Sequence, residues 1–338
     1  NASIDDLNFT LIKSHLKEIG SDLLTEADRI PFIDLCRRMN IVEGPDEYVK
    51  PKNAGLLFFN DEPHRYFKGA QIDIVEFRDE VGDSFTERIF TGPLRQQIVS
   101  SLAYIKNNIL VENIRKVPDR AEAIRFFNYP YQAFEEGLVN AVYHKSYEIN
   151  EPVEVRIYPD RIEILSYPGP LPPLNKDNLM DENISSRRYR NRIIGDLLKE
   201  LHLTEGRNTG FRKIRKALMM NGSPEPVFRT DDERSYFLTV LRIHPEAQVG
   251  AQVEAQVEKV IELTGTQIKI LSECARNPMS KKEIAEMLGH SNVSGNLKKA
   301  IKELLANGLL DYTIPEKPRS RFQRYQTTVS GRKIIKKG

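Results

Sequence analysis

The sequence of 338 residues contains no tryptophan and only two cysteines, Cys36 and Cys274. These cysteines lie far apart in the sequence and near no histidine cluster, which excludes a disulfide framework and the ligand spacing of a zinc site. No apolar run approaches the roughly 20 residues that a membrane-spanning helix needs, and no signal-peptide pattern opens the sequence. We therefore expect a protein of the reducing cytoplasm that has no membrane partner.

Also absent is the glycine-rich loop ending in Gly-Lys-Ser or Gly-Lys-Thr with which P-loop ATPases and helicases hold phosphate. A helicase activity of the P-loop type is therefore unsupported by this sequence. The hydrophobic fraction of 40% and the charged fraction of 29% are those of an ordinary globular protein. A chain of this length exceeds one typical hydrophobic core, so we expect two or three domains.

Positive charge is concentrated at the C-terminal end of the chain. The last 75 residues carry 15 Lys and Arg against 6 Asp and Glu, whereas the whole chain has a formal net charge of +2. The residues before them are therefore acidic, with a net charge of about −7. A cationic segment that also has the pattern of a folded helical unit is typical of a nucleic-acid-binding module. Double-stranded DNA is the partner that this pattern favours.

This basic segment has the sequence pattern of a winged helix–turn–helix. Apolar residues at helical spacing predict three helices, and two short apolar runs around a cationic loop predict a two-stranded wing. Ser280 and Glu283 have the spacing of a capping box, which marks the start of the second helix. The predicted elements are helices over 266–275, 280–288 and 291–306 and strands over 309–314 and 322–329.

In a winged helix the third helix presents its N-terminal side chains to the major groove, and the wing contacts the phosphate backbone. Asparagine can pair with adenine, and lysine with guanine or phosphate. The expected groove residues are Asn292, Ser294, Asn296, Lys298 and Lys299. The expected backbone contacts on the wing are Lys317, Arg319, Arg321 and Arg324. The alternatives are a winged helix that binds protein and a basic face that is merely solvated.

A helix predicted over 131–143 carries polar residues along one face. Glu136, Asn140 and His144 follow one another at intervals of four, which aligns them along the helix. Period-two alternation on both sides of Pro159-Asp160 predicts a β-hairpin directly afterwards. The residues alone leave two interpretations open, because this polar face can form a binding site or can simply pair with the hairpin.

The order of these segments resembles that of GHKL-type ATPases, in which a Glu-x-x-x-Asn helix is followed by a hairpin and by two glycine turns. Here the turns are Pro168-Gly169 and 205–210. A longer series resembles a bacterial family of predicted transcriptional regulators, often labelled RecG-like helicase-related proteins. The segments that carry this second resemblance, over nearly the whole chain, are 53–59, 92–94, 136–144, 160–164, 168–169 and 209–214.

The GHKL resemblance implies Mg-ATP as the ligand, with Asn140 holding Mg²⁺ against the phosphates and Glu136 activating water. The nucleotide contacts that it implies are Asn140, Gly169, Gly206, Thr209 and Gly210. The regulator family implies a C-terminal winged helix and an Alba-like (Schlafen-type) domain upstream of Asn1. One departure is clear: 166–169 (Ser-Tyr-Pro-Gly) stands where the ATPases have an Asp that binds the adenine amino group.

Two basic clusters flank the second glycine turn. The cluster before it is open to three interpretations, which are phosphate contact, an intersubunit ion-pair surface and plain solvation. The cluster after it lies near phosphates in a nucleotide-binding protein and otherwise forms an exposed helix face. The members are Arg187, Arg188, Arg190 and Arg192 before the turn and Arg212, Lys213, Arg215 and Lys216 after it.

We expect an α+β multidomain fold in which a degenerate GHKL-like α/β sandwich is joined to a C-terminal winged helix–turn–helix. The predicted parts are an α+β segment over 1–125, the sandwich over 126–245, an Ala-Gln-Val repeat linker over 246–262 and the winged helix over 263–338. The favoured function is a DNA-binding transcriptional regulator whose middle domain senses a nucleotide or forms a homodimer. The alternatives are an ATPase that couples hydrolysis to DNA or partner binding, and a protein-interaction scaffold without nucleotide.

Overall fold

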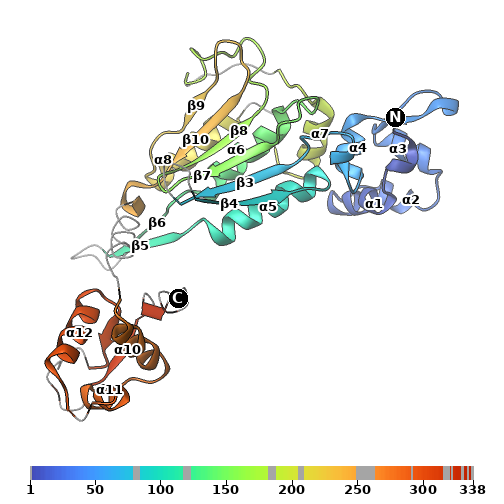
Figure 1. The fold of residues 1–338 in the computed structure, drawn as a ribbon. Helices are drawn as coiled ribbons and strands as arrows, with labels where there is room; N and C mark the ends of the chain where they lie inside the picture. Colours follow the sequence, from blue (N-terminus) through green and yellow to red (C-terminus); the bar gives the residue numbers. More distant parts are fainter. Residues whose placement is uncertain are drawn as a thin grey trace. The chain divides into compact units, whose positions relative to one another are not determined.

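The computed structural model describes residues 2–78, 84–116, 123–181, 188–204, 209–248, 263–290, 292–314, 320, 323–328, 331–332 and 335. The chain divides into two compact units, which we call the N-terminal unit (Asn1–Val249) and the C-terminal unit (Gly250–Gly338). The division falls inside the Ala-Gln-Val segment. Both units combine helices with strands (Figure 1), and none of the described helices is long and apolar enough to cross a membrane.

The N-terminal unit begins with a small helical subdomain. Asn8 caps its first helix, because the side-chain oxygen accepts hydrogen bonds from the backbone N–H groups of Thr10 and Leu11 at 2.8 and 3.3 Å. The apolar run that begins at Ala54 is a helix whose residues 54–59 are all buried. The elements are α1 (Phe9–Glu18), α2 (Leu23–Glu26), α3 (Phe32–Arg38), α4 (Asn53–Phe59), a short pair of strands β1 (Val42–Glu43) and β2 (Lys50–Pro51), and 3₁₀ turns at Ile4–Asp6, Asp46–Tyr48 and Pro63–Arg65.

A six-stranded mixed sheet forms the centre of this unit, in the order β4-β3-β7-β8-β10-β9. All neighbours are antiparallel except β3 and β7, which are parallel. The predicted hairpin around Pro159-Asp160 is confirmed as β7 and β8. The sheet thus combines strands from the predicted segment 1–125 with strands from the predicted sandwich 126–245. The bounds are β3 (Ile72–Phe77), β4 (Phe85–Phe90), β7 (Val153–Ile157), β8 (Arg161–Ser166), β9 (Val227–Arg229) and β10 (Phe237–Arg242).

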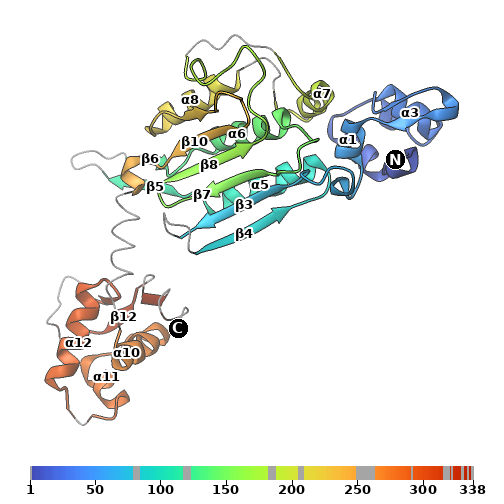
Figure 2. The same cartoon turned by 45° about the horizontal axis from the view of Figure 1, so that its top comes forward.

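Helices α5 (Leu94–Asn108) and α6 (Tyr131–His144) cover one face of the sheet (Figure 2). Ile74, Val155 and Ile164 lie side by side across three strands and are buried. Burying one such side chain contributes about 1.5–3 kcal/mol. Helix α6 approaches β8 closely at Gly137, where an added Cβ would lie 2.9 Å from Ile164 Cδ1. This packing fixes the position of the polar face of α6.

Two further helices and a second hairpin complete the N-terminal unit. Helix α8 (Gly210–Asn221) packs on α6 and ends at Gly222, whose φ of +75° is the left-handed conformation favoured by glycine at helix ends. Asn221 joins this end of α8 to the hairpin, since its side chain accepts a hydrogen bond from Phe127 N and donates one to Phe127 O. The other elements are α7 (Arg192–Glu200) and the hairpin strands β5 (Glu112–Lys116) and β6 (Ala123–Phe127).

The C-terminal unit contains three helices followed by an antiparallel pair of strands. Its core is formed by Ile270, Ile284, Leu297, Ile301 and other apolar residues. The predicted capping box at Ser280 is confirmed. The third helix starts four residues later than predicted, because Ser294 caps it. The bounds are α10 (Gly265–Arg276), α11 (Lys281–Met287), α12 (Gly295–Ala306), β11 (Leu310–Tyr312) and β12 (Tyr325–Thr327).

Candidate functional site

The polar face of α6 lines a pocket in the N-terminal unit. Glu136, Asn140 and His144 are all part of its wall, so the three residues that the sequence aligned on one face border a common space. The start of α8 and the segment after β8 supply the opposite walls. The space between atoms amounts to about 910 Å³, including the part that is open to solvent. Mixed apolar and polar walls of this kind are typical of small-molecule sites.

At one end of the pocket α8 begins directly above the Glu136–Asn140 pair. Asn140 Nδ2 donates a hydrogen bond to Glu136 Oε1 at 3.3 Å, and Lys213 Nζ lies 3.7 Å from Glu136 Oε2. The Glu136 side chain is only 13% exposed. A half-buried lysine therefore neutralises a largely buried carboxylate at this polar end of the pocket.

The first position of α8 has no room for a side chain while Asn140 and Glu136 keep their positions. An added Cβ on Gly210 would lie 2.4 Å from Asn140 Nδ2 and 2.9 Å from Glu136 Oε1, distances that real Cβ atoms essentially never show. Thr209, the N-cap residue of α8, also lines the pocket. The backbone of α8 therefore comes as close to the amide and carboxylate of α6 as atomic radii allow.

Gly169 lies in a second wall of the pocket for a different reason. Its N–H donates a hydrogen bond to Arg234 O at 2.7 Å, and an added Cβ would lie 2.5 Å from Thr230 Oγ1 and 2.6 Å from Tyr236 O. The glycine thus lets the chain segment after β8 cross closely over the segment that leads into β10. This crossing positions Pro168, Gly169 and the following residues along the pocket.

The other end of the pocket is aromatic. The rings of Tyr143 and Tyr189 are parallel within 2°, with centroids 5.3 Å apart, and the His144 ring lies 4.7 Å from Tyr143. Burial, together with the nearby guanidinium of Arg190, lowers the pKa of His144 to about 4. The imidazole is therefore neutral at pH 7.

Two side chains hold this aromatic end in place. Arg190 donates hydrogen bonds to the carbonyl oxygens of His144 and Gly169, and so connects the end of α6 to the glycine turn. Asn191 donates to Tyr143 O at 2.9 Å and to Lys145 O at 2.6 Å. In the basic cluster before the second glycine turn, Arg190 thus has a structural partner, while Arg188 and Arg192 are exposed.

The predicted site residues of the N-terminal unit are mostly brought together. Glu136, Asn140, Gly169, Thr209 and Gly210 all line the same pocket, although they come from three separate segments of the chain. Gly206 and Arg187 lie outside the described residues. The sequence alone does not distinguish Lys213 from the other basic residues after the second glycine turn. Its position three residues after Gly210, on the same helix, is the signal that could have identified it as a site residue.

All five predicted groove residues of the C-terminal unit are exposed. These are Asn292, Ser294, Asn296, Lys298 and Lys299. The Ser294 hydroxyl accepts a hydrogen bond from Leu297 N at 3.2 Å as the N-cap of α12, and Asn292 precedes that helix. Lys299 Nζ lies 4.0 Å from Glu303 Oε1. Lys298 therefore stands out as a cation on the exposed face of the third helix.

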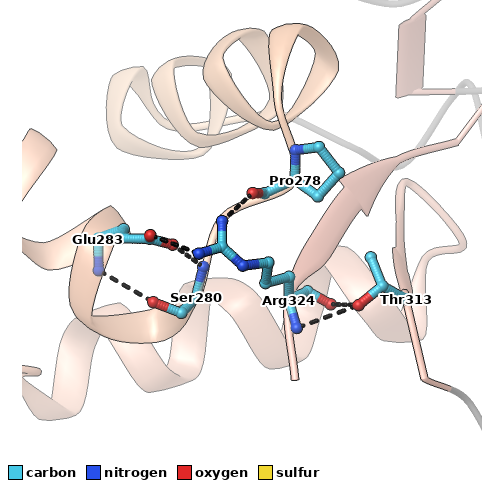
Figure 3. Close-up of polar contacts among 5 residues, drawn as sticks. All are labelled: Pro278, Ser280, Glu283, Thr313 and Arg324. Atoms are coloured by element: carbon cyan, nitrogen blue, oxygen red, sulfur yellow. Dashed lines mark hydrogen bonds and ion pairs between the residues drawn. The ribbon is translucent and has the colours of Figure 1, made fainter. Parts of the chain in front are cut away.

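Among the predicted wing residues, Arg324 has partners within the unit (Figure 3). Its guanidinium donates to Pro278 O and to Glu283 Oε1, both at 2.8 Å. Glu283 also accepts a hydrogen bond from Ser280 N in the capping box, which lowers the pKa of its carboxyl. Arg324 thus links β12 to the start of α11. Lys317, Arg319 and Arg321 lie outside the described residues.

Two parts of the chain match known protein families. Residues 150–241 match the family described as putative ATP-dependent DNA helicase recG C-terminal. An ATPase-like domain related to that of RecG is therefore present, and the match begins after α6. Residues 266–328 match the C-terminal domain of Fic-like proteins, described as filamentation induced by cAMP. No curated protein matches the chain.

A solved structure shares the fold. It is the crystal structure of the DIP2311 protein from Corynebacterium diphtheriae, with a TM-score of 0.53 and 17% sequence identity. The match covers 100% of this chain and 64% of that one, so the present chain spans less than two thirds of that protein. At this identity the likeness concerns the fold alone.

Proposed function

We propose that this protein is a DNA-binding regulator that responds to an adenine nucleotide. The N-terminal unit binds Mg-ATP in the pocket on α6, and the C-terminal unit is a winged helix that binds double-stranded DNA. The observation that carries the proposal is the convergence of Glu136, Asn140 and Gly210 at one end of a pocket, in a unit with an ATPase-like family match.

The polar end of the pocket fits the phosphates and the metal ion of a nucleotide. Asn140 offers an amide oxygen for Mg²⁺, and Lys213, beside it, offers an ammonium group for phosphate. Mg²⁺ neutralises phosphate charge when it is bound. In the part of the chain that the structure describes, no group of three His, Cys, Asp or Glu could hold a metal ion. The ion would therefore arrive with the phosphates.

The surroundings of Glu136 favour binding over rapid hydrolysis. A general base must have a free lone pair within reach of the water that it activates. One Glu136 oxygen accepts a hydrogen bond from Asn140 and the other faces the Lys213 ammonium at 3.7 Å, so the carboxylate is shared between two protein contacts and only its second lone pairs remain for a water. We therefore infer a sensor of nucleotide, and an ATPase is the alternative that the same site supports if Lys213 leaves Glu136.

Calorimetric titration of the full chain with Mg-ATP tests the nucleotide site. We expect saturable binding that is lost in Asn140→Ala. No heat with folded wild-type protein would refute the nucleotide part of the proposal. Phosphate release that is abolished by Glu136→Gln, but unchanged by Glu135→Gln one residue earlier on α6, would instead establish the ATPase.

Binding to DNA is supported by the charge and exposure of the third helix. Asn296 and Lys298 are exposed near the start of α12, where a winged helix contacts the major groove. Binding to phosphates through lysine weakens with salt, because each neutralised phosphate releases about one counterion. The structure thus gives the DNA proposal two specific side chains to test.

Mobility shifts of the full chain on double-stranded DNA test this part. Lys298→Gln is expected to weaken binding and to lower the salt slope by about 1, because one phosphate contact is lost. Lys269 is an exposed lysine on α10, so Lys269→Gln removes the same charge away from the third helix and serves as the control. This variant should bind DNA as the wild type does. If binding is absent at low salt, or survives deletion of 263–338, the DNA reader is refuted.

A further inference from the structure

The phosphate site proposed above does not use the aromatic end of the pocket. We propose that His144 selects the base of the nucleotide by accepting a hydrogen bond from the exocyclic amine of adenine. This inference rests on the proposed function, because it places the base in a pocket whose polar end holds the phosphates. It also addresses the missing Asp at 166–169, since no Asp lines the described part of the pocket.

The distance along α6 suits this assignment. His144 follows Asn140 by four residues, about one turn or 6 Å along the helix axis, and both side chains border the same space. A ribose spans a gap of this size between the phosphates and the base. A nucleotide with its phosphates at Asn140 can therefore extend its ribose and base along α6 toward His144.

Flat walls at this end of the pocket favour a planar ring. Tyr189 lies parallel to Tyr143, and the His144 ring is inclined by 28° to Tyr143, so the three rings stack on one another where they border the pocket. Pro168, Gly169 and Leu171 border the same pocket. Arg190 bonds to the carbonyls of both His144 and Gly169, which ties these two parts of the wall together. Aromatic and apolar walls of this kind stabilise a purine by stacking.

The His144 imidazole can accept a hydrogen bond from an uncharged donor group of a ligand. The ring is surrounded by protein on most sides but remains partly exposed. The charged group beside it is the Arg190 guanidinium, which together with burial keeps the imidazole uncharged at pH 7. A neutral imidazole has one N–H donor and one lone pair, so one ring nitrogen accepts from an amine whichever tautomer is present.

Competition between two nucleotides tests the inference with the full chain. The probes are Mg-ATP and the Mg complex of purine riboside triphosphate, which lacks only the 6-amino group. Wild-type protein is expected to prefer ATP by about tenfold, the effect of one hydrogen bond. His144→Phe keeps a stacking ring without a lone pair, so the preference should disappear while affinity for the deaminated analogue stays within about twofold. His144→Gln keeps an acceptor and should retain part of the preference.

The outcomes separate this inference from the proposed function. If His144→Phe still prefers ATP tenfold, or wild type binds both nucleotides equally, the role of His144 is refuted and the nucleotide site stands. If wild-type protein binds neither nucleotide, the proposed function fails and the inference fails with it. If circular dichroism shows that His144→Phe does not fold, the preference of the wild type and that of His144→Gln still test the role of His144.

Discussion

Replacing Gly210 by alanine tests the polar end of the pocket most directly. The alanine Cβ would lie 2.4 Å from Asn140 Nδ2 and 2.9 Å from Glu136 Oε1. Neither distance can be kept, so the Asn140 amide has to move away from the start of α8. The variant therefore displaces the proposed Mg²⁺ ligand without removing any functional group.

The expected effects on stability and on binding differ in size. Alanine in place of glycine stabilises a helix by about 0.4–1 kcal/mol through the unfolded chain. Loss of the hydrogen bond from Asn140 to Glu136 destabilises the protein by about 0.5–1.5 kcal/mol. These terms oppose each other, so the free energy of unfolding should change by less than about 1 kcal/mol. Affinity for Mg-ATP should fall by at least about tenfold, or ~1.4 kcal/mol.

Gly265→Ala is the matched control. Gly265 is also the first residue of a helix, α10, but an added Cβ there meets no atom within 4 Å. Calorimetric titration with Mg-ATP and urea denaturation should be measured on both variants. The control should bind as wild type and be slightly more stable. Unchanged Mg-ATP affinity in Gly210→Ala would refute the placement of the phosphates at Asn140 and Gly210.

Three further substitutions probe other parts of the molecule. Arg324→Gln should lower the free energy of unfolding of the C-terminal unit by about 1 kcal/mol in urea, because its bonds to Pro278 and Glu283 are half exposed. Burial raises the pKa of Asp73 to about 6 from 3.8. As the pH rises, the Asp73 carboxyl ionises in the unfolded chain before it ionises in the folded protein. The free energy of unfolding therefore falls between pH 4 and 6. Asp73→Asn should therefore be more stable than wild type by about 1–3 kcal/mol at pH 7, and equal to it near pH 4, in thermal unfolding. Lys213→Gln should weaken binding of Mg-ATP about tenfold by calorimetry but leave adenosine binding unchanged; Lys216→Gln, with the same charge on α8, should alter neither.

Elements that local signals determine could be predicted from the sequence. The β7–β8 hairpin follows from period-two alternation around a Pro-Asp turn, and the start of α11 follows from the capping box of Ser280 and Glu283. The start of α12 was misplaced because serine and asparagine at 291–294 are all good N-cap residues. Only the fold decides that Ser294 takes this position.

Contacts between distant parts of the chain could not be predicted in the same way. The parallel pairing of β3 with β7 joins residues about 80 positions apart, and no short-range pattern encodes it. Lys145 is another case, since a lysine is expected to be exposed. Its side chain is buried and donates to the carbonyl oxygens of Ser146, Ile149 and Glu151, while burial lowers its pKa to about 8.

The candidate site lies between these two extremes. The spacing of Glu136 and Asn140 placed both on one face of α6, because helical periodicity is local. Which residues lie opposite that face depends on how α8 crosses α6, and this crossing is a tertiary property. The resemblance to ATPases supplied Gly210 as a nucleotide contact, but the ion pair between Lys213 and Glu136 became visible only with the fold.

Helix α8 connects the polar end of the pocket with the β5–β6 hairpin of the same unit. Its first residue touches the Glu136–Asn140 pair, and its last, Asn221, bonds to Phe127 on the β5–β6 hairpin. The neighbouring Phe126 ring stacks on His244 at 4.1 Å, shortly before the chain enters the Ala-Gln-Val segment toward the C-terminal unit. A ligand changes a distant equilibrium only if its affinity differs between two states of the protein. Because α8 is a continuous helix of 12 residues, a shift of Gly210 away from Asn140 on nucleotide binding has to move Asn221 or bend the helix. In the proposed function, the position of α8 is therefore the variable through which a bound nucleotide changes the β5–β6 hairpin.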